Sequence, residues 1–265
     1  MTDTQSDKML SRKDGAVGHV IFNNPERHNA VSLEMWDAVD RILDDFEKDA
    51  AIRVVVLSGA GGKSFVSGAD ISKFEKERGS EEAVRHYNER IKVVYERIHQ
   101  FPKPTIAMIN GYCIGGGLNL AVACDLRFCS EKSKFAMPAA RLALGYPYSA
   151  IKRLMDAIGA SAAKNLMFSA ERIDAAEAFR IGFVQKVLPE EELEDHVGAY
   201  AAKISANAPL TVKAMKLISN EVLKDPSDRD LAACGRLVDA CFASEDYKEG
   251  RRAFMEKREP QFQGK

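Results

Sequence analysis

Residues 111–125 read GYCIGGGLNLAVACD, three consecutive glycines in an apolar run that holds one amide, Asn119. The preceding residues, 104–111, are typical of a strand that enters a glycine turn. GGLNLAVACD is typical of a short helix, and residues 126–131 of a further strand. The same order of strand, glycine loop, helix and strand recurs along the chain. It predicts an α/β fold with mostly parallel strands and with helices outside the sheet.

Segments nearer the N-terminus follow this pattern. HVIFNN (19–24) and IRVVVLSGAG (52–61) are typical of strands that run into turns. Apolar residues recur every three to four positions over 32–49, where Ser32 is suited to cap a helix. A charged helix is expected over residues 80–100.

The pattern changes after Pro189, where helical periodicity replaces the alternation of strands and loops. The chain is therefore expected to consist of a core, residues 1–190, and an all-helical C-terminal region, residues 191–265. Its helices are expected over 190–205, 209–223, 227–243 and 245–257.

The composition is that of an ordinary globular protein. The 265 residues, 46% of them hydrophobic and 29% charged, suit one large domain or one domain with an appendage. The net charge of −1 gives no overall attraction to nucleic acid or to an anionic membrane. The first residues are polar, without the pattern of a signal peptide, and no apolar run reaches the roughly 18 residues of a membrane span.

Cysteine, histidine and glycine usage excludes several kinds of site. The five cysteines are odd in number and include no Cys-x-x-Cys pair, so we expect reduced thiols and a cytoplasmic protein. The five histidines are scattered, and no metal is expected. SGAGGKS (58–64) does not fit a phosphate-binding loop, because Leu57 stands where that pattern needs a glycine. No G-x-G-x-x-G follows a strand, so no nicotinamide or flavin cofactor is expected.

Two glycine-bearing loops follow expected strands, FVSGADISKF (65–74) and NGYCIGGGLNL (110–120). They are explained either as tight turns and helix starts, or as loops that expose backbone N–H groups toward a common point. A helix that begins near Gly116 would face that point with the positive end of its dipole. Two converging donors form an oxyanion hole, in which losing one donor costs about 3 kcal/mol of barrier. The spacing alone leaves both explanations open.

Several segments together resemble the crotonase superfamily, also called the enoyl-CoA hydratase/isomerase family. They occur in family order and cover nearly the whole chain. The segments are NNPERHNAVSLEM (23–35), KSFVSGADI (63–71), FPKPTIAMINGYCIGGGLNLAVACDLRFCSEKSKFAMP (101–138), SAERIDAAEAFRIGFVQKVLP (169–189) and SEDYKEGRRAFMEKREPQF (244–262).

The resemblance implies a crotonase-like spiral of ββα units with a C-terminal helical region. That region is implied to build homotrimers, often paired into hexamers. The implied substrate is an acyl-CoA thioester, with coenzyme A as part of the substrate and no further cofactor. The N–H groups of Ala69 and Gly116 are implied to hold the thioester oxygen as an enolate forms.

Hydratases of this family carry glutamates at two positions that are Asn119 and Ala139 in this chain. Hydration needs one group to deprotonate water and another to deliver a proton to carbon, and carboxylates of raised pKa can do both. An amide and a methyl group cannot, so the oxyanion hole is expected without the acid–base pair. Asn119 is explained equally well as a group that orients water or substrate, or as one that satisfies nearby backbone.

The stretch LGYPYS (144–149) is similar to a segment of methylmalonyl-CoA decarboxylases in which a tyrosine follows the proline. That tyrosine corresponds to Tyr148, whose hydroxyl could orient a carboxylate or protonate an enolate. Tyr146 and Tyr148 are otherwise explained by aromatic packing with the hydroxyl at the rim. Arg141 is explained by a pair with a substrate carboxylate or, more simply, by a solvated surface position.

The resemblance also implies a coenzyme A site. Lys257 could meet a phosphate and Phe254 cover the adenine, although this basic stretch could equally be a solvated face at a helix end. Asp70 and Asp125 are expected to be structural, and His86 and Tyr87 to be exposed. The residues implied to bind coenzyme A are Asn29, Ala30, Val31, Ser67, Ile71, Phe254 and Lys257.

Three functional hypotheses follow. The first is an enzyme of the hydratase/isomerase family that acts on an acyl- or enoyl-CoA through an enolate. The second is another reaction of the same enolate: decarboxylation of a malonyl-type thioester, isomerisation or thioester hydrolysis. The third is a non-catalytic acyl-CoA-binding homologue that kept the fold.

Overall fold

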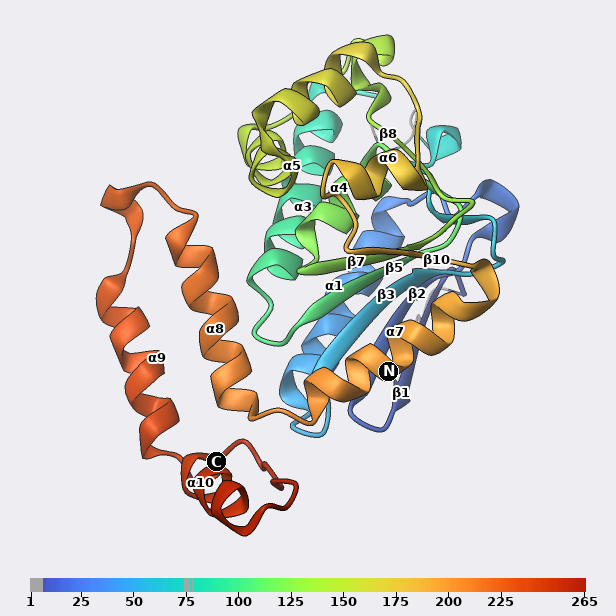
Figure 1. The fold of residues 1–265 in the computed structure, drawn as a ribbon. Coiled ribbons are helices and arrows are strands. Elements are labelled where there is room, and N and C mark those ends of the chain that lie inside the picture. The colour runs from blue at the N-terminus through green and yellow to red at the C-terminus, as the bar shows by residue number, and fades with distance from the viewer. Residues whose placement is uncertain (1–6, 74–76, 78) are drawn as a thin grey trace, which may run out of the picture.

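The strands of this protein belong to two sheets (Figure 1). The computed structural model describes residues 7–73, 77 and 79–265. In that part of the chain the larger sheet has six strands, in the order β1-β2-β3-β5-β7-β10, and the smaller has four, in the order β4-β6-β8-β9. The strands are β1 (Met9–Asp14), β2 (Val17–Phe22), β3 (Val54–Gly59), β4 (Ser64–Val66), β5 (Thr105–Ile109), β6 (Tyr112–Ile114), β7 (Leu126–Ser130), β8 (Lys134–Ala136), β9 (Ile173–Asp174) and β10 (Lys186–Leu188).

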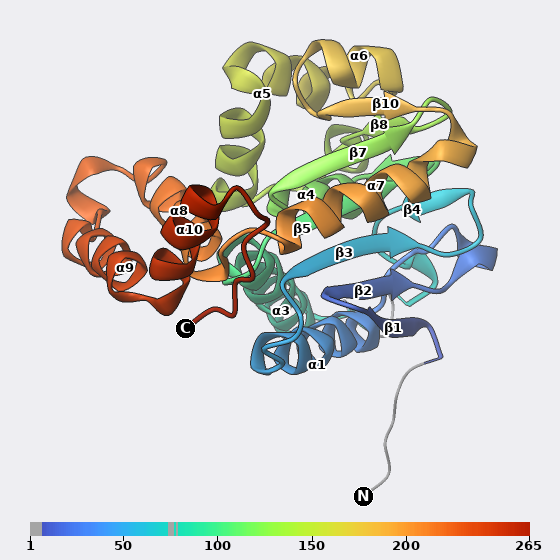
Figure 2. The same ribbon diagram turned by 60° about the horizontal axis from the view of Figure 1, so that its bottom comes forward.

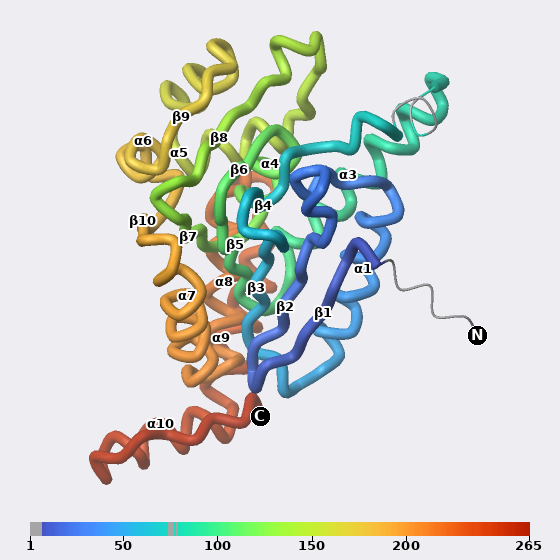
Figure 3. Tube along the Cα trace, turned by 90° about the vertical axis from the view of Figure 1, so that its right-hand side faces the viewer, coloured from blue at the N-terminus to red at the C-terminus, as the bar shows by residue number. Residues whose placement is uncertain are grey.

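From β3 to β8 successive strands alternate between the sheets, and each pair of strands is followed by a helix. β3 and β4 precede α3 (Glu81–Gln100), β5 and β6 precede α4 (Gly116–Ala123), and β7 and β8 precede α5 (Tyr148–Ser169). Each unit therefore adds one strand to each sheet, which is the expected spiral of ββα units (Figure 3).

Most strand pairs are parallel. Pairing is parallel from β2 through β3, β5 and β7 to β10, and antiparallel between β1 and β2. The predicted α/β class and the mostly parallel pairing are confirmed. The pattern in the sequence does not reveal β1, because its residues after Met9 are all exposed and mostly polar. It does not reveal the strands of the smaller sheet either, because strands of two or three residues have no measurable periodicity.

Helices cover both faces of the larger sheet. Alternate residues of a strand point to opposite faces. In β3, Val55 and Leu57 belong to the core under α1 (Leu33–Lys48) and α3, whereas Val54 lies in the cluster under α7 (Glu190–Ser205). α1 begins as predicted, because the Ser32 hydroxyl accepts a hydrogen bond from the Met35 N–H.

The last three helices extend away from the sheets (Figures 1 and 2). α7 packs on the larger sheet through Leu193, Val197 and Ala201, so the extension begins after it. It consists of α8 (Pro209–Val222), α9 (Leu231–Ala243) and α10 (Glu245–Glu256). Within the described chain, no residue of α9 is buried.

The helices predicted beyond residue 190 are present, with one difference. Pro226–Asp228 forms a separate 3-10 turn, and α9 begins only at Leu231, where the Asp230 carboxylate accepts a hydrogen bond of 2.7 Å from the Ala233 N–H. The core also contains α6 (Ala175–Arg180). Among the described residues, no helix combines the length and the apolarity that crossing a bilayer requires.

Candidate active site

The ends of three neighbouring strands place the candidate site. β4, β6 and β8 are adjacent and parallel in the smaller sheet. Parallel strands end at the same edge of a sheet, so the loops that follow them meet there. These loops hold Gly68 and Ala69 after β4, the glycine triplet after β6, and Ala139 after β8. The topology therefore gathers residues that lie 70 positions apart in the sequence, from Ala69 to Ala139.

The first two loops come into close contact. A Cβ atom added to Gly68 would lie 3.8 Å from the Gly116 nitrogen, and one added to Gly116 would lie 3.6 Å from the Gly68 Cα. Gly116 is the first residue of α4, so its N–H has no partner within the helix. The predicted helix start near Gly116 is confirmed.

Val31 fixes the orientation of the first loop. Its N–H donates to the Gly68 carbonyl oxygen at 2.9 Å, and its carbonyl oxygen accepts from the Asp70 N–H at 3.0 Å. In a parallel ladder this pattern turns the groups of the residue between them, Ala69, away from the partner strand. The N–H groups of Ala69 and Gly116 thus have no hydrogen-bond partner in the part of the chain that the structure describes.

Asn119 and Ala139 both lie beside the glycine triplet. Asn119 is buried in α4, and its side chain hydrogen-bonds with the hydroxyl of Tyr95 from α3. Ala139 is half-buried in the turn after β8, and a Cβ atom added to Gly115 would lie 3.9 Å from the Cδ of the preceding Pro138. The absence of carboxylates at these two positions is a feature of the sequence, and their correspondence to catalytic glutamates stays a prediction.

Tyr95 is a residue of this site that the sequence analysis did not identify. Its hydroxyl donates a hydrogen bond of 2.9 Å to the Gly116 carbonyl oxygen. Burial raises the pKa of Tyr95 well above its ordinary value, and the nearby Tyr146 and Tyr87 raise it further. A sequence signal existed, because Tyr87, Val94, Tyr95 and Ile98 form one face of α3 at helical spacing.

The expectation that Tyr87 is exposed is wrong. Tyr87 retains only 1% of its accessible surface because it belongs to the buried face of α3. His86, its neighbour, points to the other side of the helix and is exposed, as expected. Although α3 carries many charged residues, it is an amphipathic helix with one buried face and is not solvated on all sides.

The tyrosines around Pro147 have different environments. Tyr148 is the first residue of α5 and is 74% exposed, whereas Tyr146 is half-buried against the core and acts electrostatically on Tyr95. Arg141 is exposed. The structure thus places Tyr146, rather than Tyr148, beside the tyrosine of α3, and contact of Tyr148 with substrate stays a prediction.

The residues implied to bind coenzyme A fall into two separate groups. Asn29, Ala30 and Val31 lie against the loop after β4, together with Ser67, whose N–H donates to the His28 carbonyl oxygen. Ile71 follows this loop and is 68% exposed. The second group, Phe254 and Lys257, belongs to α10 and its C-cap at the opposite end of the molecule (Figures 1 and 3). One copy of the chain does not bring the two groups together.

Asn29 has a structural task in this region. Its amide nitrogen donates to the carbonyl oxygens of Ala60 at 3.0 Å and Ser64 at 2.7 Å, and its oxygen accepts from the Asn24 N–H at 2.8 Å. These bonds occupy the whole side chain, so any contact with a ligand would come from the backbone. The sequence alone does not distinguish such a bracing residue from one that binds a ligand.

Asp70 and Asp125 are structural, as expected. The Asp70 carboxylate accepts hydrogen bonds from the N–H and hydroxyl of Ser72 and lies 3.5 Å from the Arg27 guanidinium. Asp125 accepts from the N–H and hydroxyl of Thr105 and forms an ion pair with Lys216. These bonds engage both carboxylates in holding the loop after β4 and the junction of α4 and β7.

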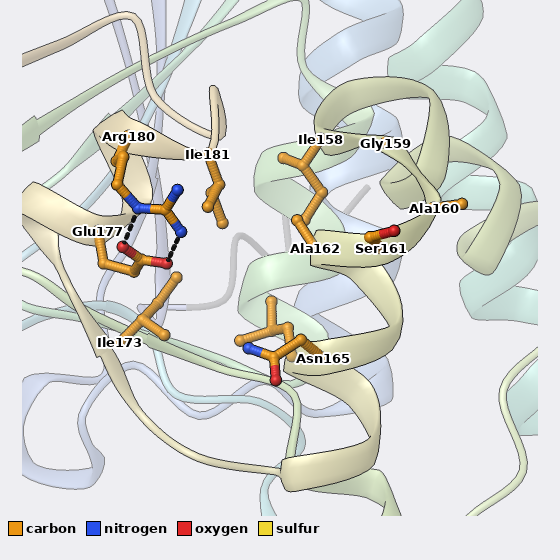
Figure 4. Close-up of a pocket in the computed structure, with 11 residues that line it drawn as sticks. Ile158, Gly159, Ala160, Ser161, Ala162, Asn165, Ile173, Glu177, Arg180 and Ile181 are labelled. Carbon is orange, nitrogen blue, oxygen red and sulfur yellow. Dashed lines mark hydrogen bonds and ion pairs between the residues drawn. The ribbon is translucent and has the colours of Figure 1, made fainter.

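A separate cleft of about 560 Å³ lies between α5 and α6 (Figure 4). It is lined by the non-helical Gly159 of α5, and Glu177 and Arg180 form an ion pair at its edge. None of its lining residues belongs to the three loops of the candidate site. Among the described residues, no group of three or more His, Cys, Asp or Glu side chains is arranged to hold a metal.

Comparison with known proteins assigns the family. The enoyl-CoA hydratase/isomerase family model matches residues 12–265. The chain is 36% identical over 250 residues to a short-chain-enoyl-CoA hydratase of Clostridium acetobutylicum, covering 94% of this chain and 95% of that protein. It is 35% identical over 260 residues to a crotonyl-CoA hydratase of Syntrophomonas wolfei, covering 97% and 98%.

A solved structure has the same fold. An enoyl-CoA hydratase/isomerase family protein from Hyphomonas neptunium superposes with a TM-score of 0.92 at 31% sequence identity, covering 96% of this chain and 97% of that one. The chain therefore belongs to the enoyl-CoA hydratase/isomerase family, and the crotonase fold expected from its motifs is confirmed.

Proposed function

We propose that this protein is an acyl-CoA-processing enzyme that binds the thioester carbonyl oxygen between the N–H groups of Ala69 and Gly116. One observation carries the proposal: two loops at the same edge of the smaller sheet approach each other, and each presents an N–H without a partner among the described residues. Such preorganised donors stabilise the negative charge that develops on the oxygen as an enolate forms. Membership of the family supports the choice of a coenzyme A thioester.

The reaction on this enolate is proposed to proceed without a pair of carboxylates. Asn119 and Ala139 flank the glycine triplet, and the groups that act on the neighbouring Tyr95 include no Asp or Glu. Hydration, which the names of the relatives indicate for those proteins, requires an acid–base pair. Decarboxylation of a malonyl-type thioester is the second candidate, because departure of carbon dioxide itself generates the carbanion.

Kinetics with crotonyl-CoA and methylmalonyl-CoA separate these reactions. We expect slow hydration by the unaltered protein, and at least about a tenfold gain in the double variant Asn119→Glu, Ala139→Glu. Hydration at an ordinary enzymatic rate without these changes would contradict the argument from missing carboxylates. Calorimetric binding of coenzyme A with no turnover of any thioester would instead identify a non-catalytic homologue. Isomerisation or hydrolysis would appear as a third product in the same assay.

Tyr148 is proposed to contribute only if the reaction is a decarboxylation. In that case Tyr148→Phe is expected to lower the rate at least about tenfold, since the hydroxyl would orient the leaving carboxylate. Its exposed position at the start of α5 makes the variant safe for folding. An unchanged rate removes Tyr148 from the site.

The protein is further proposed to form homotrimers, or dimers of trimers, through its C-terminal helices. α9 is without buried residues in the described chain, and its Leu231, Val238 and Phe242 are exposed. In such an assembly Phe254 and Lys257 of one copy would complete the coenzyme A site of another. The five cysteines are free, which supports a reducing, cytoplasmic location.

A further inference from the structure

The hydroxyl of Tyr95 lies beside Gly116, where the two glycine loops approach each other. A Cβ atom added to Gly116 would lie 3.2 Å from this hydroxyl and 3.6 Å from the Cα of Gly68. The hydroxyl also donates to the Gly116 carbonyl oxygen at 2.9 Å. Tyr95 therefore contacts Gly116 of one proposed donor segment, and Gly116 in turn lies against Gly68 of the other.

Rigid elements hold the side chain in this place. Tyr95 is 4% exposed, and its ring packs edge-on against Trp36 of α1, with 5.2 Å between the ring centroids. The polar end is held by the Gly116 carbonyl oxygen and by the side chain of Asn119. A phenol fixed at both ends by α1 and α4 meets the positional demand on a group that reacts with a bound substrate.

The surroundings favour the neutral phenol. The groups that act on Tyr95 are Tyr87 from α3, Tyr146 from the segment before α5, Arg153 from α5 and Asn119 from α4. Burial, the largest effect, raises the pKa of Tyr95 well above its ordinary value, and only Arg153 and Asn119 oppose the rise. The side chain thus keeps its proton near neutral pH and is suited to donate it.

We propose that Tyr95 is a catalytic residue that delivers the proton to the α-carbon of the enolate held by Ala69 and Gly116. The inference rests on the proposed function. The O–H bond of the phenol breaks, the electron pair of the enolate forms a C–H bond at the α-carbon, and the thioester carbonyl is restored. The negative charge passes to the phenolate, which then takes a proton from solvent water. The transfer is favourable because an enolate carbon is a much stronger base than a phenolate.

In this step Asn119 stabilises the phenolate form of Tyr95. Its hydrogen bond with Tyr95 lowers the pKa of the phenol, so it stabilises the phenolate that remains after the transfer. A carboxylate at position 119 would repel that phenolate. An amide beside a tyrosine is therefore chemically consistent with this step: the tyrosine supplies the proton and the amide stabilises the phenolate.

Two measurements on one variant test the inference. Red-shifted absorbance of bound hexadienoyl-CoA reports polarisation of the carbonyl by the oxyanion hole. Incorporation of deuterium at the α-carbon of butyryl-CoA in D2O reports proton transfer, which by microscopic reversibility uses the same group in both directions. We expect Tyr95→Phe to keep the red shift and to slow the exchange at least about 100-fold. Tyr200→Phe, on α7 at the opposite face of the larger sheet, is the control and should change neither.

The possible results have different consequences for the inference and for the proposed function. Exchange at the rate of the unaltered protein in Tyr95→Phe overturns the inference. Loss of both the red shift and the exchange also overturns it, because Tyr95 would then only position Gly116. No red shift in the unaltered protein contradicts the proposed function itself, and a red shift without any exchange in the unaltered protein contradicts the inference alone.

A second variant tests the same inference if Tyr95→Phe is unstable. Replacing Tyr95 with difluorotyrosine preserves the shape and the hydroxyl but makes the phenol more acidic. In the exchange reaction the phenolate of Tyr95 removes the α-proton. The exchange rate therefore rises with pH toward the pKa of the phenol, because the fraction of phenolate increases. We expect this rise at lower pH in the difluorotyrosine variant, and a profile that does not move would overturn the inference.

Discussion

At Gly115, Gly116 and Gly117 a side chain is excluded for three different reasons. Gly115 has a φ of 55° and a ψ of −110°, a conformation that residues with a Cβ rarely adopt. A Cβ on Gly116 would crowd the Tyr95 hydroxyl, and one on Gly117 would lie 1.9 Å from the Val66 carbonyl oxygen. The triplet therefore combines a backbone turn, a close approach at the site, and the packing of α4 on β4.

The tightest of these contacts gives a prediction for stability. Gly117→Ala forces α4 and β4 apart, because a backbone oxygen cannot move aside as a flexible side chain can. We expect the free energy of unfolding, measured with urea, to fall by about 3 kcal/mol. Gly198→Ala is the control: it lies in α7 with open space around its Cβ position and should gain up to about 1 kcal/mol. Equal midpoints for Gly117→Ala and the unaltered protein would contradict the packing argument.

A buried histidine gives a prediction for pH dependence. Burial, and to a smaller extent Arg153, lowers the pKa of His99 below 6.5. The unfolded chain takes up a proton as the pH falls through about 6.5, whereas the folded protein resists it, so stability falls with decreasing pH and levels off below the folded pKa. His99→Gln should make this fall less steep in urea unfolding from pH 7 to pH 5.

The control for this prediction is His86→Gln. His86 is exposed on the same helix, and its replacement should leave the slope unchanged. Burial also lowers the pKa of His19, so part of the pH dependence of stability should remain in His99→Gln. A slope in His99→Gln as steep as in the unaltered protein would show that His99 does not contribute.

At the level of elements, α8 is fastened to the core by polar contacts rather than by a broad apolar face. Lys216 is nearly buried, and its ammonium lies 2.8 Å from the Asp125 carboxylate and donates to the Lys103 carbonyl oxygen at 3.0 Å. Asn220, one turn further, donates to the His99 carbonyl oxygen at 3.1 Å. These contacts determine where the C-terminal extension leaves the core.

Lys216→Met tests this attachment. It leaves the Asp125 carboxylate without its cation, and since that carboxylate is partly exposed we expect a loss of roughly 2 to 3 kcal/mol in the free energy of unfolding. Lys213→Met, the same change on the exposed side of α8, should have little effect. Faster proteolysis between α7 and α8 in the Lys216 variant would accompany the loss. Resistance equal to that of the Lys213 variant would mean that other contacts hold the helix.

At the level of the whole molecule, the C-terminal extension exposes an apolar surface. α8 and α9 pack on each other, and α9 presents Leu231, Val238 and Phe242 to solvent with exposures of 72%, 41% and 61%. A patch of this kind on an extended segment commonly lies against another copy of the chain. The proposed assembly would also account for the separation of Phe254 and Lys257 from the loop after β4.

Light scattering after size-exclusion chromatography measures the assembly directly. We expect a trimer or hexamer for the unaltered protein and a monomer for Phe242→Glu, since a charge in an apolar interface is costly to desolvate. Phe242→Leu keeps the apolar surface and should keep the assembly. A monomeric unaltered protein, or an unchanged mass in Phe242→Glu, would contradict the proposed interface.

The sequence by itself determined the local elements and the family. The spacing of apolar residues in α1 and α7 fixes the faces they bury, and the glycine triplet fixes a turn followed by a helix start, because both effects act between residues close in the chain. The five segments that resemble the family were together sufficient to predict the fold. Only the tertiary structure decided which side chains share the site. Tyr95 reaches Gly116 because α3 packs against α4, a long-range contact that no periodicity encodes. Phe254 is far from the loop after β4 because the chain beyond α7 carries α10 away from the sheets.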